Sequence, residues 1–263
     1  MSKRKQTLLK YVVEEYLESG TPIGSQTLKT SINLSISSAT IRNGFKALMD
    51  EGFLLQPHIS SGRIPSFLAL KDYWRNTLEL GSEKILSDAQ ELQKLSAEIG
   101  CFVASIDIEN LKLKEVENFE DKFLVLKFNK EKEVLLRYVP QLFRFLNELV
   151  GMDLEDIQSI AHQVHAKDLL QSLVSINQKT YFHGAKYLSS LMEEKRGERL
   201  FFEMIEGRIF ERLSNGIYFE EILPKGYILF IQNVLIEEKK SRVLFCGTLD
   251  CDYRKTQSIW KGE

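Results

Sequence analysis

Apolar residues recur at helical spacing through the first part of the chain. They come in pairs every four residues and predict one helix from Lys3 to Ser19, ended by Gly20. A shorter helix is expected at residues 25–30. The pairs that form the buried face of the first helix are Leu8/Leu9, Val12/Val13 and Tyr16/Leu17.

A third helix is expected from Ser37 to Gly52. Ser37 is a preferred residue type for a helix start, and Gly52 can adopt the left-handed conformation that often follows a helix. Its apolar face is formed by Ile41, Phe45, Leu48 and Met49. Its opposite, polar face is formed by Ala39, Arg42, Asn43 and Lys46. Gly44 lies in the middle of this helix, where it should cost about 1 kcal/mol relative to alanine.

Strand and turn patterns follow this helix. Residues 53–55 and Ile59 favour strand, and residues 60–63 (Ser-Ser-Gly-Arg) favour a hairpin tip. Two helices six residues apart, followed by a hairpin, are typical of a winged helix-turn-helix. A further helix should begin at Ser66 and end at Gly81, and residues 81–83 are expected to form a linker.

The rest of the chain predicts strands on both sides of a helical middle. Two strand pairs would each be marginal alone, which favours one sheet interrupted by a helical insertion. The expected elements are a helix at 84–99, a strand at 101–108, a hairpin at 123–128 and 134–139, helices over 141–213, and strands at 226–236 and 242–246.

Charge is distributed unevenly. The net charge is −2, but residues 1–75 contain ten Lys or Arg against six Asp or Glu, whereas the remainder contains 25 against 31. A basic N-terminal part on an acidic remainder is a modest indication of a phosphate-bearing partner.

Motifs for catalysis or cofactor binding are missing from the sequence. It lacks a phosphate-binding P-loop, a G-x-S-x-G and an H-E-x-x-H motif, so we expect no enzyme activity, no cofactor and no metal. The three cysteines, Cys101, Cys246 and Cys251, have no metal-ligand spacing and are expected to be structural thiols. No signal peptide and no apolar run near the ~18 residues of a membrane helix is present, so we expect a cytoplasmic protein without membrane contact.

Several separate motifs in the N-terminal part match a known family in order and spacing. They are Glu14-Glu15-Tyr16, Gly20-Thr-Pro-Ile-Gly-Ser25, Ser37-Ser-Ala-Thr-Ile-Arg-Asn43, Gln56-Pro-His58 and Ser61-Gly-Arg-Ile-Pro65. On these motifs, residues 5–66 resemble the heat-inducible transcription repressors (HrcA). Beyond residue 80 the resemblance rests on the order of elements and on short runs such as Leu95-Ser-Ala-Glu-Ile-Gly100.

The resemblance implies an α+β protein in four parts: an N-terminal winged helix-turn-helix domain, then a GAF-like sheet domain in two parts with an inserted, mainly helical dimerising segment between them. In this sequence they would span residues 1–80, 84–139, 140–195 (the insert) and 196–263. It also implies a homodimer that represses chaperone genes from an inverted-repeat operator in double-stranded DNA. Repression would be supported by the chaperonin and relieved by heat.

Residue chemistry assigns roles within the expected DNA interface. Arg pairs with guanine and Asn with adenine through two hydrogen bonds each, and Lys neutralises phosphate. Thr40, Arg42 and Asn43 are therefore the candidate base readers, and Ala39 allows close approach. Backbone positioning is expected from Ser25, Ser37, Ser38, Lys46 and Arg63, with His58 as a further contact in the hairpin.

Two other interpretations stay open at this point. The polar face of the third helix is also compatible with a solvated surface, or with a winged helix that holds a protein partner. The C-terminal half is also compatible with an enzyme that binds a small molecule under control of the N-terminal part, or with a regulator of other genes that responds to a small ligand. DNA binding should weaken steeply as salt rises, which distinguishes it from contact with a protein partner. A calorimetric screen of metabolites tests whether the C-terminal half binds a small ligand.

Overall fold

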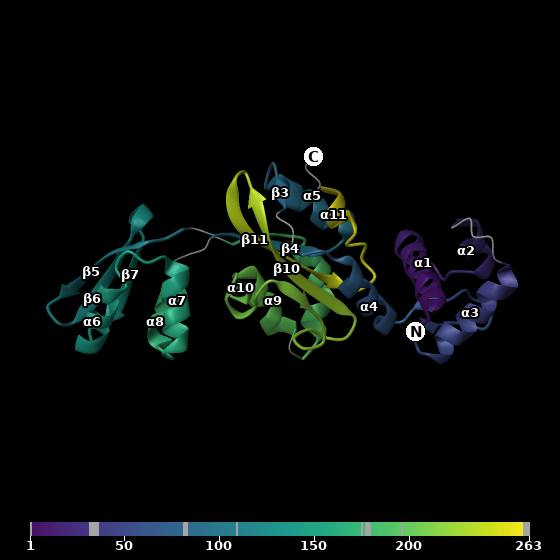
Figure 1. Ribbon diagram of the computed structural model, residues 1–263, viewed down its shortest axis with the longest axis horizontal. Helices are drawn as coiled ribbons and strands as arrows, with labels where there is room; N and C mark the ends of the chain where they lie inside the picture. The colour runs from purple at the N-terminus through teal and green to yellow at the C-terminus, as the bar shows by residue number, and fades with distance from the viewer. Residues whose placement is uncertain are drawn as a thin grey trace. The chain divides into compact units, whose positions relative to one another are not determined.

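The computed structural model describes residues 2–31, 37–80, 84–108, 110–174, 176, 180–195 and 197–259. It confirms the expected mixed α+β class (Figure 1). The chain divides into two compact units, of which the first is Met1–Ser105 with Thr180–Glu263 and the second is Ile106–Lys179.

The N-terminal part of the first unit is three helices followed by a two-stranded antiparallel ladder and a fourth helix. The expected first and second helices are confirmed, and the expected turn at 32–36 lies outside the described residues. The fourth helix starts after the Ser66 cap as expected but ends at Thr77, short of Gly81. The elements are α1 (Lys3–Ser19), α2 (Ser25–Ser31), α3 (Ser38–Asp50), β1 (Leu54–Leu55), β2 (Ile64–Pro65) and α4 (Phe67–Thr77).

The remainder of this unit is built on a six-stranded sheet with the order β3-β10-β11-β4-β8, in which β9 also pairs with β10. The expected C-terminal hairpin is confirmed, with register running from Tyr227↔Thr248 to Ile236↔Lys239. The strands are β3 (Ile85–Leu86), β4 (Phe102–Asp107), β8 (Thr180–His183), β9 (Gly216–Tyr218), β10 (Tyr227–Ile236) and β11 (Lys239–Thr248).

Helices cover both faces of this sheet (Figure 1). On one side lie α5 (Gln90–Ile99) and α11 (Lys255–Ile259), and on the other lie α9 (Gly197–Ile205) and α10 (Ile209–Arg212), which follow the 3-10 helix η2 (Ala185–Glu193). The face that includes Phe230 and Phe245 shares one continuous core with α1, α3 and α4. Trp74 of α4 is fully buried there and donates its indole N–H to the Leu249 carbonyl oxygen at 2.8 Å.

The helix expected over residues 84–99 begins later than predicted. Residues 85–86 instead form β3, which pairs in parallel with β10, and the Leu235 N–H donates to the Lys84 carbonyl at 2.7 Å. The Asp88 carboxylate accepts from the Gln90 N–H at 2.8 Å at the helix start. Pairing with the sheet therefore overrides helical periodicity in the first residues of this segment.

The second unit contains its own three-stranded sheet, β5-β6-β7, and its own core. The prediction of one interrupted sheet was therefore wrong, because β5 was not recognised in the polar sequence LKEVENF. The predicted hairpin is present as β6 and β7 but pairs with β5. The elements are β5 (Leu113–Phe119), β6 (Phe123–Phe128), the 3-10 turn η1 (Asn129–Glu131), β7 (Glu133–Arg137), α6 (Pro140–Glu148), α7 (Leu154–Gln163) and α8 (Lys167–Val174).

The apolar helix positions of residues 140–174 cover this small sheet. Leu146, Leu149, Ile157, Leu169 and Leu173 are all buried in the core of the second unit. The compact unit accordingly begins at Ile106 and ends at Lys179, whereas the predicted insert spans residues 140–195. Residues 180–195 form β8 and η2 of the first unit instead.

Candidate nucleic-acid interface

The predicted N-terminus of α3 is fixed by its cap. The Ser37 hydroxyl accepts the Thr40 backbone N–H at 3.1 Å and also lies 3.0 Å from the Thr40 hydroxyl oxygen. Ile41, Phe45 and Leu48 are buried, which confirms the predicted apolar face of this helix. The cap and this core hold the opposite face of α3 outward.

A side-chain hydrogen bond braces α3 against α2. The Ser38 hydroxyl donates to the Gln26 side-chain oxygen at 2.7 Å. Gln26 is the second residue of α2 and follows Ser25, which is half-buried. Ser38 is therefore occupied in fixing the angle between these helices. No sequence pattern points to Gln26, because the bond depends on how closely the two helices approach.

The predicted polar face of α3 is open to solvent. Ala39, Arg42, Asn43 and Lys46 are all exposed, and Thr40 is half-buried at the edge of the face. Within the part of the chain that the structure describes, the side chains of Arg42, Asn43 and Lys46 make no hydrogen bond or ion pair. The face thus presents two cations and one amide whose hydrogen-bonding groups are available to a ligand.

A groove of about 470 Å³ flanks α3 on the side of α1, and Arg4, Lys5, Thr40, Asn43 and Gly44 are among its lining residues. The two helices approach closely here: a Cβ on Gly44 would lie only 2.3 Å from a Leu8 methyl carbon. A side chain at residue 44 would therefore force Leu8 to move. This contact explains a glycine that helix propensity alone marks as unfavourable.

The hairpin after α3 is tied to the segment that precedes α2. Ile23 and Arg63 form an antiparallel bridge with two backbone hydrogen bonds of 2.8 Å. A Cβ on Gly62 would lie 2.6 Å from backbone atoms of Pro22 and Ile23, so only glycine fits this crossing without a shift of the backbone. The base of the hairpin is consequently anchored to the helices.

Arg63 is not at the hairpin tip, contrary to the prediction. It is half-buried beside β2, and its guanidinium donates to the Ser61 carbonyl at 3.0 Å, while its Nε is buried. Ile59 is not in a strand either, because residues 58–61 form a turn closed by the Ser61 N–H and the His58 carbonyl at 2.9 Å. His58 is exposed within this turn.

Comparison with known proteins extends the resemblance along the whole chain. A family model described as the HrcA C-terminal domain matches residues 74–262. A heat-inducible transcription repressor HrcA of Helicobacter pylori strain 26695 is 34% identical over 254 residues, which cover 95% of this chain and 91% of that protein. The counterpart from strain J99 is 32% identical over the same shares.

The chain belongs to the HrcA family of heat-inducible transcription repressors. The resemblance noted in residues 5–66 is thereby confirmed, and it reaches well beyond residue 80. A crystal structure described as that of a hypothetical protein aligns with a TM-score of 0.53 at 19% identity, covering 98% of this chain and 95% of the other. At that identity the likeness concerns the fold alone.

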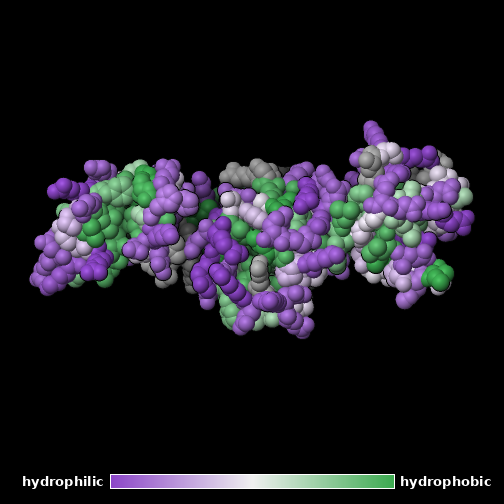
Figure 2. Space-filling view, turned by 90° about the horizontal axis from the view of Figure 1, so that it is seen from below, coloured by the Kyte–Doolittle hydropathy of each residue, from purple (hydrophilic) through white to green (hydrophobic). Residues whose placement is uncertain are grey.

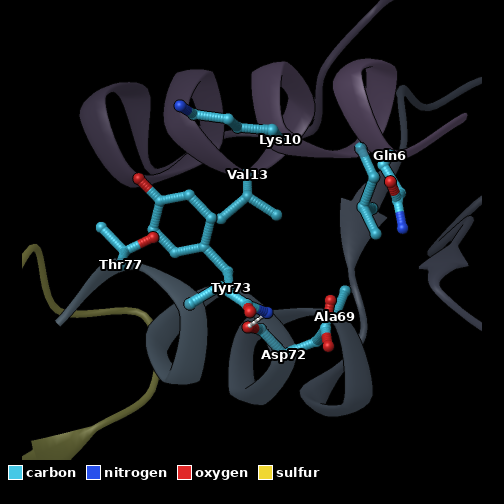
Figure 3. Close-up of a pocket in the computed structure, with 9 residues that line it drawn as sticks. Gln6, Lys10, Val13, Ala69, Asp72, Tyr73 and Thr77 are labelled. Carbon is cyan, nitrogen blue, oxygen red and sulfur yellow. Dashed lines mark hydrogen bonds between the residues drawn. The ribbon is translucent and has the colours of Figure 1, made fainter. Parts of the chain in front are cut away.

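Another concave region of this HrcA chain lies between α1 and α4 (Figure 3). Its volume is 370 Å³, and its lining includes Lys10, Val13, Asp72 and Tyr73. The Tyr73 hydroxyl lies 3.3 Å from the Glu14 carboxylate, and burial, followed by the charge of Glu14, raises the pKa of Tyr73 to about 12. Among the described residues no group of three His, Cys, Asp or Glu side chains has the arrangement of a metal site.

Cys101, distant in sequence from Cys246 and Cys251, lies with them near Tyr253 of the same unit. A Cβ on Gly247 would lie 2.7 Å from the Tyr253 hydroxyl oxygen and 3.0 Å from the Cys101 Cβ, and Cys251 Sγ lies 3.6 Å from the Gly100 carbonyl. Burial raises the pKa of Cys101, Cys246 and Cys251. Protonated thiols are weak nucleophiles, which agrees with a structural role.

No helix in the described ranges is long and apolar enough to cross a membrane.

Proposed function

We propose that this HrcA chain represses transcription by binding operator DNA through a winged helix-turn-helix formed by residues 3–65. The observation that carries the proposal is the exposed face of α3, where Ala39, Arg42, Asn43 and Lys46 stand on a capped and braced helix. A helix presented in this way fits the major groove, and its Arg and Asn can each read one base through two hydrogen bonds.

The remaining candidates divide into base readers and positioning residues. We assign Arg42, Asn43 and the half-buried Thr40 to base edges, and Lys46 to a phosphate. Ser37 and Ser38 act indirectly in this proposal, since their hydroxyls already cap α3 and bond to Gln26. Ser25 remains a candidate phosphate contact at the start of α2, and His58 a candidate contact from the hairpin.

The protein would act as a homodimer on an inverted-repeat operator, because one winged helix covers only one half-site. Most apolar positions of the helices in residues 140–174 already pack on the core of their own unit, where Leu146, Ile157 and Leu169 are buried. The outer face of β5–β7 is a better contact for a second copy: Phe119 stacks on Phe123 with 5.2 Å between ring centroids, and Leu135 is 63% exposed beside Val125.

Charges surround this apolar face and favour a two-fold contact. Glu117 and Lys127 form an ion pair on neighbouring strands, and Glu133 and Arg137 are exposed on β7. Leu135→Glu should convert the dimer to a monomer in sedimentation equilibrium without a large change in melting temperature. Gln141→Glu adds the same charge to an exposed position of α6 and should leave the dimer intact. A Leu135→Glu protein that stays dimeric would place the two-fold contact elsewhere.

Relief by heat and support by the chaperonin enter the proposal from the family. The relatives are named heat-inducible repressors, and chaperone genes are the targets implied by the sequence resemblance. The core shared by α1, α3, α4 and the proposed GAF-like sheet supports a thermal response, because loosening of the sheet would also loosen the DNA-reading helices. Operator affinity should therefore fall over the temperature range in which near-UV circular dichroism is lost, and chaperonin with ATP should restore it.

The salt dependence of DNA binding tests the proposal. Fluorescence anisotropy with an operator duplex should give a slope of log K against log salt near −0.9 for each phosphate neutralised. Lys46→Gln should reduce the magnitude of this slope by about 0.9 per subunit. If the protein binds no DNA even at low salt but binds another protein at all salt concentrations, the alternative of a protein-interaction module is favoured.

A further inference from the structure

The tip of the hairpin between β1 and β2 is rigidly built. The turn at residues 58–61 is closed three times: the Ser61 N–H donates to the His58 carbonyl at 2.9 Å, the Ser61 hydroxyl donates to the same carbonyl at 2.7 Å, and the His58 N–H donates to that hydroxyl at 3.0 Å. The Gln56 amide donates to the Ile59 carbonyl at 2.7 Å. Every polar bond in this turn therefore restrains the backbone around Ile59.

Arg63 supports the same turn from its base. Its guanidinium donates to the Ser61 carbonyl at 3.0 Å, and its backbone is held by Ile23. Gly62 allows this crossing by its close approach to Pro22 and Ile23. The hairpin thus has a fixed base, a braced turn and a tip whose position relative to α2 is set by backbone contacts.

The side chain displayed by this framework is apolar and entirely in solvent. Ile59 is 99% exposed, and the next most exposed large apolar side chain among the described residues is Leu135 at 63%. An isolated exposed apolar residue is ordinary on a protein surface, and Figure 2 shows hydrophobic residues among hydrophilic ones on the face that it draws. What sets Ile59 apart is that a β-branched side chain, stiff at χ1, is held outward by a hydrogen-bonded turn.

One isoleucine is too small to bind a protein partner by itself. A stable protein–protein interface buries roughly 1,200–2,000 Å², far more than one side chain provides. Ile59 therefore suits an interface that other residues already form. In the proposed function that interface is α3 in the major groove. The hairpin leaves α3 directly, since β1 begins four residues after Asp50, so its tip would lie beside the same stretch of duplex. Isoleucine is one of the apolar residues that proteins insert into the minor groove.

We propose that Ile59 is the apolar contact of the hairpin with the minor groove of operator DNA, and that Arg63 is a positioning residue for it. This inference rests on the proposed DNA-binding function. It also sets a base preference, because the guanine amino group projects into the minor groove and an isoleucine covering it leaves that donor unpaired. Ile59 should therefore favour A·T over G·C at the base pairs beside each half-site.

Operator duplexes with A·T or G·C flanks test this contact in the full chain. Ile59→Ala should weaken binding to the A·T-flanked duplex by about five- to twentyfold. The parent should discriminate against the G·C-flanked duplex, and Ile59→Ala should lose most of that discrimination. Ile85→Ala is the matched control, since Ile85 is 57% exposed on β3 in the sheet and should bind both duplexes as the parent does.

The outcomes separate this inference from the function on which it rests. If Arg42→Ala weakens operator binding but Ile59→Ala binds both duplexes as the parent does, the minor-groove contact is overturned and DNA binding stands. If the parent binds the operator no better than a scrambled duplex, both fail. If Ile59→Ala lowers the sedimentation mass, the side chain contacts a second copy and the inference is overturned. Equal melting temperatures of parent and Ile59→Ala show that the turn itself is unchanged.

Discussion

Gly62→Ala is the sharpest perturbation of the proposed DNA-binding part. The new Cβ would lie 2.6 Å from the Ile23 carbonyl carbon and oxygen and from the Pro22 carbonyl carbon. These are backbone atoms, so no side-chain rotation relieves the overlap. The hairpin must move away from residues 22–23, which breaks the two 2.8 Å hydrogen bonds between Ile23 and Arg63.

The size of the effect follows from those two hydrogen bonds. At about 0.5–1.5 kcal/mol each, their loss lowers the free energy of unfolding by about 1–3 kcal/mol. At roughly 2–4 °C for each kcal/mol, calorimetry should record a fall of about 2–12 °C in melting temperature. Hydrogen exchange at the Ile23 and Arg63 amides should also accelerate, because both lose their acceptors.

Gly24→Ala is the matched control for this substitution. A Cβ at Gly24 meets only the Thr27 hydroxyl oxygen, at an ordinary 3.4 Å, so the melting temperature should change little. Operator affinity should fall with Gly62→Ala but not with Gly24→Ala, because only the former displaces the hairpin tip. An unchanged melting temperature in Gly62→Ala would refute the close crossing on which this reasoning depends.

Three further predictions concern other parts of the first unit. Arg42→Ala should leave the melting temperature nearly unchanged and cost about 1–3 kcal/mol of specific affinity in a mobility-shift titration; equal binding would remove Arg42 from the interface. Trp74→Phe should lower stability by about 1–3 kcal/mol in urea unfolding, because the buried Leu249 carbonyl loses its donor, and an unchanged midpoint would contradict this. The pKa of Tyr73, raised to about 12, means that its contribution to stability is complete below pH 10 and is lost as the pH rises from 10 towards 12. Tyr73→Phe should therefore lose less stability than the parent between pH 10 and 12, and identical losses would exclude this role.

Elements with strong local signals could be predicted from the sequence. Ser37 at the start of α3 and the stripe of Ile41, Phe45 and Leu48 fix both the cap and the orientation of that helix. The same holds for α1 and for the hairpin of β10 and β11, whose apolar runs are long. In these elements local propensity and tertiary packing favour the same structure.

Elements whose form depends on distant partners could not be predicted. Residues 85–86 become a strand only because β10 supplies an edge, and β5 is masked by its glutamates on the solvent face. In the candidate site, the exposed residues of α3 follow from helix periodicity. The hydrogen bond from Ser38 to Gln26 and the inward orientation of the Arg63 side chain depend on contacts between segments. Hydrophobic periodicity carries no information about such contacts.

Selection of bound fragments from a random duplex pool tests whether this protein is a sequence-specific repressor. The parent protein should enrich an inverted repeat, whereas the variant with alanine at both Arg42 and Asn43 should fold normally but enrich none. A folded parent protein that enriches no sequence would contradict sequence-specific repression. Enrichment of the same repeat by the double variant would contradict the assignment of base reading to the exposed face of α3.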